Sequence, residues 1–182
     1  MNKMTITAIA AAVGLAFSTF AAAAPTSKAE YRAAKDSIKA EYKTAKAACE
    51  PLKGNAQDVC VADAKGKEKT ALADLAASYE PSTKHRHEAR MTKARGDYAV
   101  AKEKCDNQAG NAKDVCLKEA EAAHTSAKAN AKASRKVAEA RKDAAADKND
   151  ANYSVAKEKC DALAGDAKEA CVKDAKAHYG KS

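Results

Sequence analysis

One short motif occurs three times in this chain and contains all six of its cysteines. It reads Tyr-x-x-Ala-Lys-x-x-Cys, then four residues and a glycine, then Asn/Asp-Ala-x-Asp/Glu-x-Cys. The copies span residues 42–60, 98–116 and 153–171, and ten residues separate the two cysteines of each copy. This regularity predicts a repeated structural unit with one cysteine pair in each copy.

The second copy shows what the unit is. Small and apolar residues recur at three- and four-residue intervals before its glycine, which is typical of one face of a helix packed on another helix: Met91, Ala94, Tyr98, Ala101 and Cys105. Gly110 is predicted to cap this helix in the left-handed conformation. Asn111 is predicted to cap the next helix, with Asp114 as its capping-box partner. The other copies repeat this pattern with Asn55 and Asp58, and with Asp166 and Glu169.

A turn centred between Gly110 and Asn111 places Cys105 opposite Cys116 and Tyr98 opposite Ala123. The same register places Tyr31 opposite Ser78 in the first copy and Tyr153 opposite His178 in the third. It predicts the disulfides Cys49–Cys60, Cys105–Cys116 and Cys160–Cys171. Metal binding by the cysteines is the weaker alternative, because a ten-residue gap is not a zinc-finger spacing.

Composition excludes an ordinary core. The chain is 46% hydrophobic and 32% charged, but alanine dominates the apolar fraction; there is no tryptophan, and both phenylalanines lie in the first 20 residues. Alanine favours helix and contributes little burial. No alternating β-branched segment suggests strands. We therefore expect an all-α fold, an extended array of three disulfide-stapled antiparallel helical hairpins. Full disorder is the rival interpretation.

The N-terminal segment is typical of an export signal. Lys3 precedes an apolar run and the small residues Ala21–Ala24, which predicts cleavage after Ala22 or Ala23. We expect a signal peptide over residues 1–23, no transmembrane segment in the mature chain, and an exported protein, in the periplasm or secreted. An oxidising compartment agrees with paired cysteines.

The hairpin repeats are expected at residues 24–80, 81–148 and 149–182. Pro81 predicts a helix stop and restart. No comparable breaker separates the second and third copies, so residues 111–163 form either one long helix or two.

The formal net charge is +8, and its excess lies in two stretches that the hairpin register places side by side. They predict a site for an anionic partner: Lys84, Arg86, Arg90, Arg95, Lys132, Arg135 and Lys136. Candidate partners are anionic envelope components or acidic protein clients; nucleic acid is not an expected partner. The alternative is a solvated basic face that keeps the protein soluble.

No constellation of catalytic residues is found, and we expect a protein that is not an enzyme and needs no cofactor. His85 and His87 are a weak candidate for binding copper or nickel.

The repeated Tyr-x-x-Ala-Lys-x-x-Cys run and the alanine- and lysine-rich composition resemble small exported proteins of β-proteobacteria that carry Cys-x10-Cys repeats and are often labelled TolA-like. The resemblance implies a cell-envelope setting. The expected function is therefore a periplasmic structural or interaction module. The alternatives are a holdase-like chaperone or stress protein and a weak metal binder.

Overall fold

The structure, a computed structural model, describes residues 24–181, which form five α-helices and no strand. The helices are α1 (Lys28–Ala47), α2 (Asn55–Tyr79), α3 (Thr83–Cys105), α4 (Gly110–Cys160) and α5 (Gly165–Tyr179). The all-α class expected from the sequence is thus confirmed. The proposed signal peptide, residues 1–23, lies outside the described residues.

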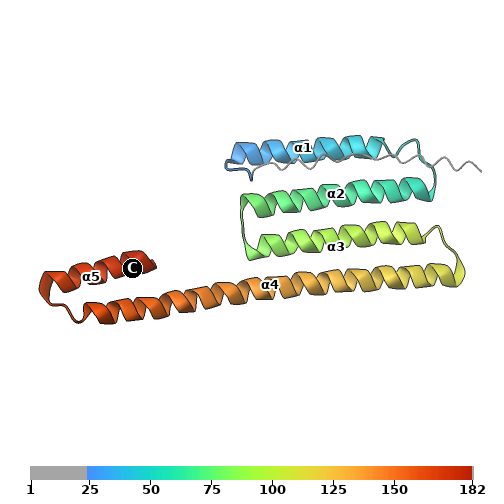
Figure 1. The fold of residues 1–182 in the computed structure, drawn as a ribbon. Helices are drawn as coiled ribbons and strands as arrows, with labels where there is room; N and C mark the ends of the chain where they lie inside the picture. The colour runs from blue at the N-terminus through green and yellow to red at the C-terminus, as the bar shows by residue number, and fades with distance from the viewer. Residues whose placement is uncertain (1–23, 182) are drawn as a thin grey trace, which may run out of the picture.

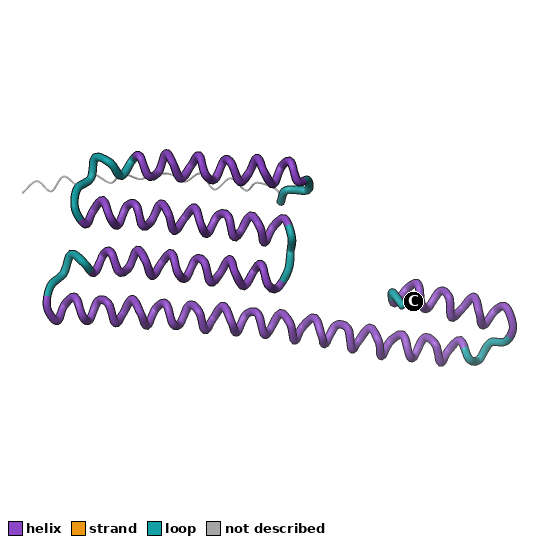
Figure 2. The backbone as a smooth tube through the Cα atoms, turned by 180° about the vertical axis from the view of Figure 1, so that it is seen from behind, coloured by secondary structure: helices purple, strands orange, loops and turns teal. Residues whose placement is uncertain are grey.

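Successive helices run antiparallel and lie side by side (Figure 1). Within residues 24–181, each helix contacts only its neighbours in the chain: α1 with α2, α2 with α3, α3 with α4, and α4 with α5. The first four helices therefore form a layer one helix thick, and α5 folds back along the far end of α4, on the same side as α3 (Figure 2). The layer has two open faces.

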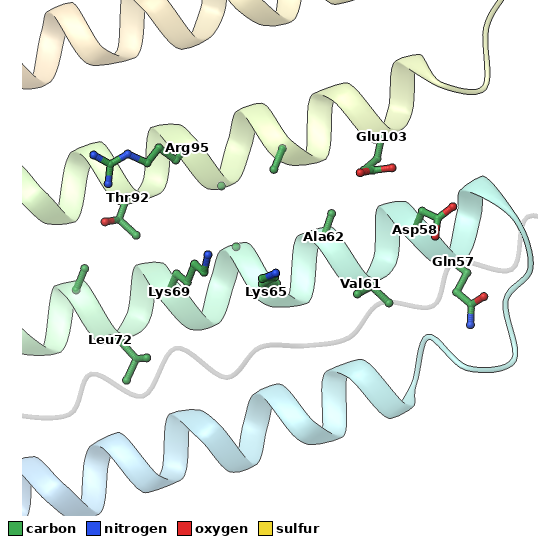
Figure 3. A pocket seen from close by; sticks show the side chains of 14 residues that line it. Gln57, Asp58, Val61, Ala62, Lys65, Lys69, Leu72, Thr92, Arg95 and Glu103 are labelled. Atoms are coloured by element: carbon green, nitrogen blue, oxygen red, sulfur yellow. The ribbon is translucent and has the colours of Figure 1, made fainter.

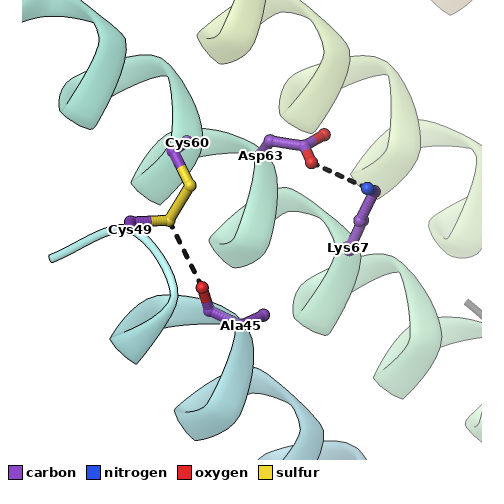
Figure 4. Close-up of a disulfide and its surroundings, with 5 residues drawn as sticks. All are labelled: Ala45, Cys49, Cys60, Asp63 and Lys67. Atoms are coloured by element: carbon purple, nitrogen blue, oxygen red, sulfur yellow. Dashed lines mark hydrogen bonds and ion pairs between the residues drawn. A yellow bond between two sulfur atoms is a disulfide. The ribbon is translucent and has the colours of Figure 1, made fainter. Parts of the chain in front are cut away.

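Three disulfides close the hairpins, each across the turn between two helices. They join Cys49 to Cys60, Cys105 to Cys116 and Cys160 to Cys171, with Cα atoms 5.6–5.7 Å apart. Figure 4 shows the first of them. These are the pairs that the sequence register predicts. All six cysteines are used within hairpins, so no disulfide joins α2 to α3.

The buried side chains of the described residues are all alanine or cysteine. They lie along the helix contacts, and no polar or charged side chain is buried with them: Cys49, Ala64, Ala89, Ala94, Cys105, Ala120, Ala131, Cys160 and Ala175. A layer one helix thick has no interior in which large apolar side chains could be covered. Close alanine seams and covalent closure replace the core of an ordinary domain.

The helices begin in two different ways, with or without a side chain that caps the first turn. Ser27 forms a capping box with Glu30 at the start of α1, and the Ser82 hydroxyl accepts from the His85 amide at the start of α3. The break expected at Pro81 is present, since α2 ends at Tyr79 and α3 begins at Thr83. No side chain caps α2, α4 or α5.

The caps expected at Asn55, Asn111 and Asp166 are therefore wrong. Each of these turns ends instead in a glycine with positive φ: 56° at Gly54 and Gly110, and 57° at Gly165. Gly110 opens α4 rather than closing α3, because α3 already ends at Cys105 in the right-handed conformation. Asn55 is used differently, since its side-chain amide donates to the Glu103 carbonyl oxygen of α3.

The aromatic contacts across the hairpins deviate from the predicted register by one residue. Tyr31 stacks on Tyr79 with ring centroids 4.6 Å apart, and Tyr98 stacks on His124 at 4.7 Å. In the third hairpin Tyr153 meets the edge of Tyr179 at 6.2 Å. The sequence placed these tyrosines opposite Ser78, Ala123 and His178. In every hairpin the ring reaches one residue further, to the next aromatic side chain.

One long helix joins the second and third hairpins. α4 runs without interruption from Gly110 to Cys160, so the boundary drawn between residues 148 and 149 lies inside it. The Asn149 side chain, near this boundary, donates to the Tyr179 carbonyl oxygen at 2.9 Å. Residues 140–148 are exposed on all sides. This part of α4 spans the distance between the two hairpins alone (Figure 1).

Candidate functional site

The two basic stretches are neighbours, as the hairpin register requires. The start of α3 packs on the middle of α4, where the His87 Nδ1 lies 3.3 Å from the Ala131 carbonyl oxygen. The structure thus brings the two backbone segments together, and all seven cations proposed as an anion site are exposed.

Their side chains do not form one patch. A helix turns by about 100° per residue, so Arg90 and Arg86 lie about 140° and 180° around α3 from Arg95. Arg95 lines a groove on one face of the layer, and the other two arginines consequently point toward the opposite face. Two of the proposed cations already have acidic partners: Arg95 lies 3.1 Å from Glu88, and Arg135 lies 3.6 Å from Glu139.

The two candidate metal-binding histidines contact different elements. The His85 Nδ1 lies 2.7 Å from the Glu80 carbonyl oxygen in the α2–α3 turn, whereas the His87 Nδ1 faces Ala131 on α4. Residues two apart in a helix point about 160° away from each other. The structure does not bring His85 and His87 together. No cluster of three or more metal-ligating side chains occurs within residues 24–181.

The electrostatics of the turns repeat between the second and third hairpins. Asp106 follows the first cysteine of its repeat and pairs with Lys113 at 2.8 Å, and Asp161 pairs with Lys168 at 2.8 Å in the same way. The hydrogen bond from the lysine, together with its charge, holds the pKa of each carboxyl below its ordinary value. The first hairpin has Glu50 and Gln57 at these positions and no such pair.

A groove of about 840 Å³ runs between α2 and α3 on one face of the layer (Figure 3). Its walls combine small apolar side chains with three cations and two acids: Gln57, Asp58, Val61, Ala62, Lys65, Gly66, Lys69, Leu72, Ala73, Thr92, Arg95, Gly96, Ala99 and Glu103. Of the residues proposed from the sequence, only Arg95 lies here. The signal that could have indicated the groove is the pair of glycines inside two predicted helices, Gly66 and Gly96.

The part of the chain that the structure describes contains no helix that is both long and apolar enough to cross a membrane. Comparison of the chain with protein-family models, with curated proteins and with solved structures finds no match.

Proposed function

We propose that this chain is a non-enzymatic structural or interaction module of the bacterial cell envelope, exported to the periplasm. The setting is supported by the three disulfides, which are compatible with an exported protein, and by the sequence of residues 1–23 and the resemblance to TolA-like exported proteins. The architecture supports the function proposed within that setting.

The observation that supports the proposal best is the layer one helix thick. Neither face of α2 or α3 is covered by another described helix, and no large apolar side chain of these two helices is exposed. Such a plate offers a large area for its size and has no interior in which a catalytic site could be enclosed. α4 extends beyond it by many turns and holds the third hairpin at a distance (Figure 1). This arrangement suits a spacer or scaffold that contacts partners along its faces.

The holdase alternative has less support from this geometry. A holdase grips unfolded clients through exposed apolar surface. The exposed large apolar side chains of the described residues are scattered over turns and over α4: Leu52, Val115, Val137, Val155 and Leu163. No patch gathers them.

Photo-crosslinking in living cells tests the proposal. A photoreactive residue is placed at Arg90 or at Ala129, both exposed, and at buried Ala94 as the control. We expect the exposed positions to crosslink to defined envelope components and the buried position to crosslink to none. The same cells are fractionated, and thiols are alkylated before lysis. A chain that remains in the cytoplasm with alkylated cysteines would contradict the proposal, and so would crosslinking to unrelated abundant proteins only.

A further inference from the structure

Two glycines face each other where the first two hairpins make contact. A Cβ atom on Gly96 would lie 3.2 Å from the Gly66 Cα, and one on Gly66 would lie 3.4 Å from the Gly96 Cα. Glycine inside a helix costs about 1 kcal/mol relative to alanine, and the seams within the hairpins use alanine instead. Here the missing side chains let two backbones approach closely. They also leave a floor of bare backbone at the α2–α3 groove.

Cations surround this floor. Lys65 and Lys69 stand one turn apart on α2, and Arg95 stands across from them on α3 beside Gly96 (Figure 3). In the antiparallel pairing that sets Gly66 against Gly96, these three residues lie at the same level along the groove. The acids of the lining, Asp58 and Glu103, lie near the Cys49–Cys60 turn at one end.

Nearby acidic side chains neutralise only part of the positive charge of Lys65, Lys69 and Arg95. Arg95 pairs with Glu88 on an exposed surface, whereas no ion pair links Lys65 or Lys69 to any described acid. Like charges one helical turn apart repel each other. On the other side of α2, Lys67 lies 2.7 Å from Asp63 (Figure 4). The lysines that face the groove thus favour an anion from outside the chain.

The remaining walls are apolar. Val61, Ala62 and Ala99 line the groove on one side of the cations, and Leu72 and Ala73 line it on the other. A groove of about 840 Å³ is far larger than a phosphate or carboxylate group needs and lies within the usual range for small-molecule sites. Its chemistry suits a molecule with an anionic head and an apolar chain.

We propose that the α2–α3 groove binds one single-chain anionic amphiphile as a monomer, with its phosphate or carboxylate head between Lys65, Lys69 and Arg95. The head lies over the glycine floor, and the apolar chain extends from it along the groove toward Leu72 and Ala73, away from Asp58 and Glu103. This ligand site goes beyond the scaffold role proposed above and does not depend on it.

The test is calorimetric titration of the oxidised protein with dodecyl phosphate below its micellar concentration. We expect one ligand per chain. The double variant Lys65→Gln, Lys69→Gln should weaken binding about tenfold or more, since it removes two charged donors. Its matched control is Lys39→Gln, Lys43→Gln, which removes the same charge with the same spacing from an exposed face of α1. The control should change the affinity by less than about twofold.

Three further ligands test separately whether the anionic head and the apolar chain are needed for binding. Inorganic phosphate tests the head alone, hexyl phosphate a shortened chain, and dodecyl maltoside an uncharged head; each should bind more weakly than dodecyl phosphate. Equal losses in the two double variants would show an effect of net charge only and overturn the site. No binding of dodecyl phosphate, or equal binding of the maltoside, would overturn it as well. A dimer in light scattering that Lys65→Gln, Lys69→Gln abolishes would assign the groove to a second copy instead.

Discussion

Removing the third disulfide should release α5 from α4 without affecting the rest of the layer. The change is Cys160→Ser with Cys171→Ser. α5 has 15 residues and contacts only α4 among the described helices. An isolated helix of that length is marginal in water. The helix therefore depends on its attachment to α4.

The magnitude follows from the contacts. Without the disulfide, α5 is held mainly by the buried methyl group of Ala175, the contact between Tyr153 and Tyr179, and the hydrogen bond from Asn149. The ion pairs Lys168–Asp161 and Lys181–Asp150 lie at exposed positions and add little. Together these contribute about 2–4 kcal/mol. The disulfide, with a sequence separation of 11, contributes about 3 kcal/mol by the chain-entropy estimate. Its loss should lower the protection of α5 amides against hydrogen exchange about a hundredfold.

Hydrogen exchange with mass spectrometry measures this directly on peptides covering residues 165–179. Protection in α1, α2 and α3 should stay the same, because only α4 connects the third hairpin to them. The matched control is Cys105→Ser with Cys116→Ser, which should leave α5 protected. A loss of less than about threefold in α5 would show that its noncovalent contacts suffice, and the reasoning would be wrong.

Three further predictions follow from the same structure. Gly96→Val should push α2 from α3 and raise the radius of gyration with little change in helix content, whereas Ala129→Val on the outer side of α4 should do neither. The pKa of Asp106 is lowered in the folded protein, so its pair with Lys113 stabilises the fold at pH values above the ordinary aspartate pKa. This stabilisation is lost as the pH falls through the pKa of the folded state. Asp106→Asn should therefore lower the melting temperature at pH 7 and leave it unchanged at acid pH. Limited proteolysis of the oxidised protein should cut first within residues 140–148, where α4 has no neighbouring helix, and a first cut inside α2 would contradict this.

Much of this fold can be predicted because the repeat carries the register. The spacing of Tyr98, Cys105 and Cys116 is the same in all three copies, which implies three similar hairpins. A disulfide between the two cysteines of one copy closes the shortest loop, which favours pairing within each hairpin. The predicted partner of each tyrosine is wrong by one residue, because a register that pairs residues directly opposite each other ignores the length of the side chains. A tyrosine ring is long enough to pass the small residue opposite and stack on the next ring.

Other features could not be predicted, because they depend on contacts between helices that the sequence does not show. Asn55 has the chemistry of an N-cap, but the carbonyl oxygen of Glu103 on α3 offers its amide a partner. The sequence left open whether residues 111–163 form one helix or two; α4 is continuous, and the Asn149 side chain bonds to Tyr179 of α5 across the hairpin. The candidate anion site was drawn from charge along the chain, and helix periodicity then distributes those side chains over both faces of the layer. Gly66 and Gly96 lie inside predicted helices, and the sequence alone does not show that they face each other where α2 contacts α3.

The central claim is that the chain is a layer one helix thick, extended by α4, with disulfides and alanine seams in place of a core. Small-angle X-ray scattering of the oxidised protein tests it most directly. With 51 residues, α4 alone is about 76 Å long, so the maximum dimension should be at least about that length. A compact chain of this size would have a radius of gyration of about 16 Å. A measured value near 16 Å, with a maximum dimension well below the length of α4, would contradict the layer.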